Sequence, residues 1–467
     1  MSFFNLYKNI KFSHVKNQFL AVMCANLVCL AHGGAMGWLS PSLLVLQSDE
    51  TPLVSGPINN ETASWVGSTT YFGGVVGNFL FMALLNHFGR KRTFSVLALP
   101  NLAFWIIVTF AKRIEFLYFG RFLGGLTGGG TFVCVPLFVA EIADDHIRGI
   151  LGSLLMIFVC IGVMISYIAG AYLTYSTAPF VIMGFPIAFL VSFLILPESP
   201  DDLMRQNRVA DAEKSLRFYK NCKADNKEDT ERFKKEWEKV QLIAQQKLDR
   251  GDKVHFNDFC TREARIGLLK GFSLISLSLF CGSPVLMNYA ALIFKDSGSK
   301  LDPSVSSIIM IAIQLIATAI STSLIDNVGR RILLIVSSTG TTIGLSAMGA
   351  YTYLSFHNYD LDGFDWVPVT SISVSVFMAY IGLVPLVFVV LMEVLPVKIR
   401  ASGTSYCLSL ISLFMFIIVK FYPTLVAIIH LHSCMWIFAA VSLLGVFFGW
   451  FVLEETKGKN INVESVK

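Results

Sequence analysis

Twelve runs of about 20 apolar residues dominate this 467-residue sequence. A helix needs about 20 such residues to cross roughly 30 Å of hydrocarbon. Helix is also the only open-chain structure that satisfies every backbone polar group in lipid. The sequence therefore predicts an all-α integral membrane protein with twelve spanning helices, near 19–39, 64–85, 93–111, 116–140, 150–172, 177–196, 268–294, 305–325, 332–354, 367–392, 402–422 and 433–453.

Composition excludes several classes of protein. Only 15% of the residues are charged and 54% are hydrophobic, whereas a soluble chain carries about 25% charged residues. This excludes a soluble enzyme, and a net charge of +5 from scattered basic residues argues against nucleic-acid binding. No phosphate-binding loop, metal-ligand spacing or paired nucleophile and base is present. We expect no enzymatic activity, no cofactor and no metal.

A long polar segment divides the spans into two sets of six. Residues 198–265 carry sixteen basic and fifteen acidic residues. The sequence predicts an N-terminal six-helix bundle at 1–197 and a cytosolic linker with short helices at 198–265. A C-terminal six-helix bundle at 266–453 and a cytosolic tail at 454–467 follow.

The distribution of basic residues predicts the orientation, because cytosolic loops are enriched in Lys and Arg. With the N-terminus inside, the outer loops hold only Lys112, Arg113, Lys295 and Lys300 of the 37 Lys and Arg residues. Both termini are then cytosolic, in a multi-pass protein of the plasma membrane. The glycosylation sequon at Asn60 falls in the first outer loop.

Charged motifs repeat after equivalent spans of the two halves. A Gly-Arg pair follows span 2 at Gly89 and span 8 at Gly329, and a Glu follows span 4 and span 10 with an Arg seven residues later. Topology alone explains the basic residues but not the matched acids. In a transporter built from two repeats, such charges can join and separate the cytosolic ends. The predicted cytosolic gate comprises Arg90, Glu141, Arg148, Asp326, Arg330, Arg331, Glu393 and Arg400.

At these motifs the chain resembles the sugar porters of the major facilitator superfamily, in particular insect facilitative hexose and trehalose transporters. The most specific stretches are Gly-Arg-Phe-Leu-Gly at 120–124, Pro-Glu-Ser-Pro at 197–200, and 393–400. The resemblance covers nearly the whole chain. It implies the major facilitator fold, alternating access, and facilitated diffusion of a sugar or polyol, with the bilayer and the solute as the partners we expect. No obligate protein partner is evident.

The resemblance implies a sugar site rich in amide side chains, and this chain departs from that pattern. Met156 and Phe388 stand where the family has a Gln and a Trp. The predicted substrate-binding residues are Gln314, Thr318, Tyr289, Met156 and Phe388. Two alternatives stay open at this point: a porter for a less polar or cationic organic solute, and a non-transporting sensor on the same scaffold.

The spans contain no Asp or Glu. Because intramembrane carboxylates serve as proton relays in coupled porters, their absence favours uniport. His32 is the one mid-membrane group that titrates near neutral pH, and a proton symporter driven through it is the alternative. Gly73 and Gly77 in span 2, with Gly120, Gly124 and Gly128 in span 4, predict faces for close helix packing.

Overall fold

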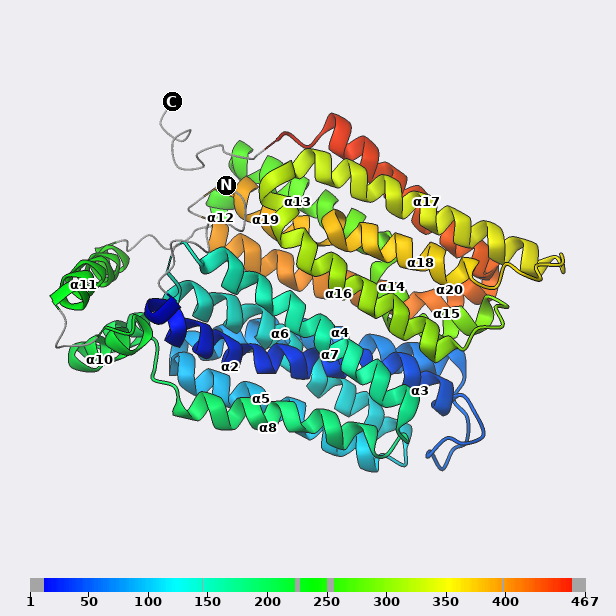
Figure 1. Ribbon diagram of the computed structural model, residues 1–467, viewed down its shortest axis with the longest axis horizontal. Helices are drawn as coiled ribbons and strands as arrows, with labels where there is room; N and C mark the ends of the chain where they lie inside the picture. The colour runs from blue at the N-terminus through cyan, green and yellow to red at the C-terminus, as the bar shows by residue number, and fades with distance from the viewer. Residues whose placement is uncertain (1–11, 145, 223–226, 250–255, 397–398, 456–467) are drawn as a thin grey trace.

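The computed structural model describes residues 12–144, 146–222, 227–249, 256–396 and 399–455, and these residues form helices joined by short loops (Figure 1). In the first half the helices are α2 (Phe12–Gly37), α3 (Leu39–Leu46), α4 (Asn60–Phe88), α5 (Arg90–Phe110), α6 (Ile114–Ile142), α7 (Arg148–Tyr172) and α8 (Ala178–Ile195). The polar segment that follows contains α9 (Pro200–Arg205), α10 (Val209–Tyr219), α11 (Lys227–Asp249) and α12 (Phe256–Phe259).

The second half repeats this pattern with more broken helices. Its elements are α13 (Arg262–Phe280), α14 (Ser283–Asn288), α15 (Ala290–Asp296), α16 (Pro303–Val328), α17 (Arg330–Phe356), α18 (Val367–Met378), the π-turn η1 (Ala379–Leu383), α19 (Val384–Val394) and α20 (Arg400–Phe451).

Eleven helical stretches among the described residues are long and apolar enough to cross a membrane. The last of them, Gly403–Phe451, contains a backbone break at His430, where φ is 64° and ψ is 163°. This break separates the predicted spans 402–422 and 433–453, so the prediction of twelve spanning helices is confirmed. Figure 1 shows the two parts of α20, in orange and red, as separate rods.

The two ends of the helical bundle differ in what they carry. Helices α10 and α11 project at one end, beside the start of α2, and we call this the linker end (Figure 1). We call the opposite end, where α3 and α15 lie, the far end. The most extensive contacts between the halves are made by α4 with α20 and by α7 with α16.

Two spans of the second half are interrupted. Gly282 separates α13 from α14 with φ of 90°, a conformation that only glycine adopts without strain. The second interruption is η1, a π-turn of the kind that recurs at functional sites. Ser321 Oγ of α16 donates to the carbonyl of Ile381 in this turn at 2.7 Å.

Helices α4 and α6 pack through glycine, as the sequence predicted for Gly73 and Gly77 of α4. On α6 the contact is made by Gly125 and Gly129, whereas the predicted Gly120, Gly124 and Gly128 face α5 and α2. The backbones approach so closely that a Cβ added at Gly73 would lie 2.2 Å from the Phe122 carbonyl oxygen. At Gly125 a Cβ would lie 1.9 Å from the carbonyl oxygen of Thr70. Because backbone atoms cannot yield as a flexible side chain can, these glycines set the distance between the two helices.

Replacing Gly125 by Ala is expected to force α4 and α6 apart. Overpacking of this kind costs about 1–3 kcal/mol, which lowers the thermal unfolding midpoint of the detergent-purified protein. Gly184 in α8 is the matched control, because a Cβ there meets no atom within 4 Å. Gly184→Ala should leave the midpoint unchanged or raise it, since Ala favours helix by about 1 kcal/mol. Equal midpoints for the two variants would contradict this packing.

Candidate functional site

A cavity of about 710 Å³ lies between the two halves. Its walls come from α6 and α7 on one side and from α16, η1, α19 and α20 on the other. The lining includes His146 and Asn327, which are exposed side chains at the linker end. The cavity therefore opens at the linker end and reaches into the bundle as far as Cys160 and Thr318.

The structure places three of the five predicted substrate-binding residues in the wall of this cavity and a fourth, Gln314, buried behind Cys160 and Thr318 of that wall. Met156, Thr318 and Phe388 line it directly. Gln314 lies one helical turn before Thr318, whose Oγ1 donates to the Gln314 carbonyl oxygen at 2.9 Å. The Gln314 side-chain amide extends toward the sulfur of Cys160, at 3.6 Å from Nε2.

Tyr289 lies away from the cavity, between α14 and α15. Its hydroxyl donates to the Val419 carbonyl oxygen at 2.9 Å, and its ring packs 5.2 Å from the Tyr422 ring. The side chain is 1% exposed. In this structure Tyr289 therefore belongs to the packing of the far end.

Sequence reasoning missed several polar residues that line the cavity. Ser321 and Thr322 belong to α16 together with Thr318. Positions 314, 318, 321 and 322 share one helical face at spacings of four, seven and eight residues, a signal readable from the sequence. Tyr380 lines the cavity from η1, and no pattern in the sequence indicates that π-turn.

The far end is closed by contacts between the two halves. Asn288 Nδ2 donates to the Tyr71 hydroxyl at 2.6 Å. Lys420 Nζ donates to Ser64 Oγ at 2.8 Å and lies 4.2 Å from the centre of the Trp65 ring. Asn288 and Lys420 belong to the second half, and their partners belong to α4.

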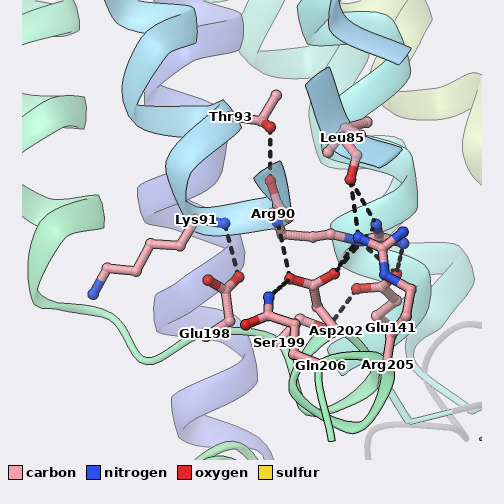
Figure 2. A network of polar contacts seen from close by, with 11 residues as sticks. Leu85, Arg90, Lys91, Thr93, Glu141, Glu198, Ser199, Asp202, Arg205 and Gln206 are labelled. Carbon is pink, nitrogen blue, oxygen red and sulfur yellow. Dashed lines mark hydrogen bonds and ion pairs between the residues drawn. The ribbon is translucent and has the colours of Figure 1, made fainter. Parts of the chain in front are cut away.

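At the linker end of the first half, Arg90 forms the centre of a polar network (Figure 2). Its Nη2 and Nε lie 2.6 and 3.0 Å from Glu141 Oε1, and Ser199 Oγ donates to Glu141 Oε2 at 2.5 Å. The backbone N–H of Arg90, at the first position of α5, donates to Asp202 Oδ2 at 3.3 Å. Asp202 thus places a negative charge at the positive end of the α5 dipole.

The second half repeats this network. Arg330 Nη2 and Nε lie 2.8 and 3.1 Å from Glu393 Oε1. The backbone N–H of Arg330, at the start of α17, donates to Glu455 Oε1 at 3.0 Å. Glu455 therefore occupies the position that Asp202 occupies in the first half.

Gly89 and Gly329 explain why a Gly-Arg pair recurs. Their φ values are 82° and 101°, in the region that favours glycine. A Cβ at Gly89 would lie 2.2 Å from Asp202 Oδ2, and one at Gly329 would lie 2.6 Å from Glu455 Oε2. Glycine thus leaves room for a carboxylate at each helix start, and neither carboxylate is among the predicted gate residues.

The remaining predicted gate residues have separate surroundings. Arg331 donates from its side chain to the carbonyl oxygens of Gly449 and Trp450, at 3.1 and 2.6 Å. Arg148 Nη2 donates to the Ala143 carbonyl oxygen at 3.4 Å. The side chains of Asp326 and Arg400 lie outside the described residues.

The linker is attached to the first half near these charges. Asp144, in the turn between α6 and α7, forms an ion pair with Lys220 and accepts from Gln18 Nε2 at 3.1 Å. Burial raises the pKa of Asp144, but the neighbouring Lys220 ammonium and the Gln18 amide outweigh burial and lower it overall. The carboxylate is therefore held in its charged form between the linker and the bundle.

His32 packs within the first half. Its ring meets the Phe132 ring edge-on at 5.9 Å, and a Cβ at Gly128 would lie 2.3 Å from its Cε1. His32 is 5% exposed. It is not among the described residues that line the cavity.

Neutralising either central carboxylate, with Glu141→Gln or Glu393→Gln, should lower stability by about 1–3 kcal/mol. Hydrogen bonds to charged groups contribute energies of this size, and these two side chains are only 6% and 13% exposed. Thermal unfolding in detergent measures the loss. Glu213→Gln is the control, because the Arg217–Glu213 pair is far more exposed and such pairs contribute about 0–1 kcal/mol. A loss for Glu213→Gln as large as for the other two would contradict the structural role.

Comparison with known proteins agrees with this architecture. A family model described as sugar (and other) transporter matches residues 24–464. The facilitated trehalose transporter Tret1 of Polypedilum vanderplanki is 30% identical over 448 residues, which cover 96% of this chain and 87% of that protein. Tret1 of Bombyx mori is 28% identical over 450 residues, covering 96% and 86%.

A solved structure shares the fold. The partially occluded inward-open xylose transporter XylE from E. coli superimposes with a TM-score of 0.75 at 19% identity, covering 94% of this chain and all of that one. The fold is therefore the twelve-helix, two-bundle fold predicted from the sequence. With the family model matching almost the whole length, this chain belongs to the sugar (and other) transporter family and is a membrane transporter, not an enzyme.

Proposed function

We propose that this protein is a uniporter that moves a neutral sugar or polyol by alternating access, and that the structure is its inward-facing state. The observation that carries the proposal is one cavity between the halves, open at the linker end and closed at the far end. Two similar bundles that rock about a central site open it to each side in turn.

The lining suits a solute with both hydroxyl groups and apolar faces. Thr322 and Tyr380 offer hydroxyls that both donate and accept. The hydroxyls of Thr318 and Ser321 donate to backbone carbonyl oxygens and can accept from a solute. The side chains of Met156, Phe388 and others provide apolar surface. The volume of about 710 Å³ falls within the range of roughly 300–1,000 Å³ for small-molecule sites. Trehalose, the solute in the names of the Tret1 relatives, is the first solute to test.

The same lining argues against the cationic solute. Among the described residues that surround the cavity there is no Asp or Glu, and a buried cation without a countercharge is costly. The predicted spans contain no Asp or Glu, since the acidic residues of these helices lie near the helix ends. His32 is packed against Phe132. Both observations support transport without proton coupling.

In this proposal the linker end faces the cytosol. The basic residues gathered at that end support the orientation. The exposed Asn60, which starts α4 at the far end, is then extracellular and open to glycosylation. We place the protein in the plasma membrane with both termini inside.

The charged residues at the linker end act as a gate when that end of the cavity closes. Arg90–Glu141 and Arg330–Glu393 tie helices within their own halves in this inward-facing state. When the linker end closes, these networks come together with Arg148, Arg331, Asp326 and Arg400. A charge network serves this step because it forms and breaks without burying apolar surface.

Flux in liposomes that contain the purified protein tests the proposed function. We expect saturable uptake of trehalose, glucose or a polyol that equilibrates without accumulating and is unaffected by a pH gradient. Accumulation driven by a pH gradient would instead establish symport. Absence of net flux for every solute tested would favour the non-transporting sensor.

Filling the cavity should abolish this flux. Met156→Trp places an indole in the space that the solute requires, so uptake should fall at least tenfold, while protein yield and unfolding midpoint stay near the wild type. Leu194→Trp is the matched control, because Leu194 is 54% exposed on the outside of α8. Flux through Met156→Trp equal to that of the control would place the pathway elsewhere.

Labelling of Cys260 tests the orientation. Cys260 is exposed beside α12, whereas the other cysteines are buried or partly buried. A membrane-impermeant maleimide should label permeabilised cells but not intact cells, and Cys260→Ser should remove the signal. Labelling of Cys260 in intact cells would reverse the proposed topology.

A further inference from the structure

Cys160 occupies an unusual place at the closed end of the cavity. It lines the cavity from α7, with only 4% of its surface exposed. Its sulfur lies 3.6 Å from Gln314 Nε2 and 3.7 Å from Thr318 Oγ1. Gln314 and Thr318 belong to α16, so this thiol of the first half meets polar groups of the second half where the solute would be held.

The Cys160 thiol is a weak hydrogen-bond partner for the Gln314 amide, at a position where a hydroxyl would fit. Sulfur is a poor hydrogen-bond acceptor and the thiol a poor donor. The thiol therefore keeps the Gln314 amide in place by a weak hydrogen bond. A hydroxyl group of the solute can easily replace the thiol as the partner of the amide. A serine at this position would hold the Gln314 amide more tightly, because the flexible glutamine side chain can close the remaining distance.

We propose that Cys160 is a positioning residue that tunes affinity for the solute. In the unloaded state its thiol accepts from the Gln314 amide and contacts Thr318 Oγ1, which holds the amide at the closed end of the cavity. A hydroxyl group of the solute replaces the thiol on the amide. This exchange selects a neutral polyhydroxy compound as the solute. The inference therefore rests on the proposed function, and it adds Cys160 as the residue that sets the affinity for that solute.

The test is the KM for trehalose uptake in liposomes, measured with the full-length protein. Cys160→Ser supplies a stronger competitor for the amide, so KM should rise about threefold to tenfold, the range for one added hydrogen bond. The maximal rate should change less than twofold. Cys160→Ala supplies no competitor, so its KM should not rise.

Two further variants separate this mechanism from a general loss of packing. In a Gln314→Met background the Cys160→Ser change should leave KM unaltered, because the competition acts through the amide. Cys434→Ser makes the same chemical change at a buried site in α20 and should not alter KM.

The outcomes distinguish the two proposals. If the wild type transports trehalose but Cys160→Ser leaves KM unchanged, or raises it equally in the Gln314→Met background, the positioning role is wrong and the transport function stands. If the wild type transports no polyhydroxy solute, the proposed function fails, and the role assigned to Cys160 fails with it.

Discussion

The bond between a partly buried arginine and a partly buried glutamate is the interaction on which each half depends. Arg90 with Glu141, and Arg330 with Glu393, join the start of one helix to the end of another at the linker end. A guanidinium presents several fixed donors, so one side chain reaches a carboxylate and also the Leu85 or Ile325 carbonyl oxygen. Each half thereby acquires a rigid end without a large apolar contact.

Contacts between the halves are of a different kind. At the far end their polar contacts include single hydrogen bonds and a cation–π contact, and at the end of the cavity they involve a thiol. Contacts of this type contribute about 0.5–1.5 kcal/mol each, less than the charged bonds inside each half. Rocking of the two halves requires that polar contacts within a half be stronger than polar contacts between the halves.

Much of the fold could be predicted from the sequence, because lipid permits few structures and the spans repeat. The partners of Arg90 and Arg330 were also predictable, since the glutamates recur at matched positions. Asp202 and Glu455 were not, because they lie in polar segments and reach the helix starts only through the turns at Gly89 and Gly329. Tyr289 was predicted in the cavity because 268–294 reads as one continuous apolar run, and nothing in that run indicates the break at Gly282 that precedes Tyr289 in the structure.

In this mechanism two rigid halves rock so that one cavity opens at the linker end or at the far end in turn. Pulsed electron resonance distances between spin labels test it most directly, with Cys260 replaced by Ser and exposed positions labelled in pairs. Lys214 with Glu263 reports the linker end, and Glu50 with Asp360 reports the far end. When trehalose is added, a population should appear in which the linker-end distance is shorter and the far-end distance longer, while the Glu50–Lys214 distance within the first half stays constant. A changed Glu50–Lys214 distance, or parallel changes at both ends, would contradict the account.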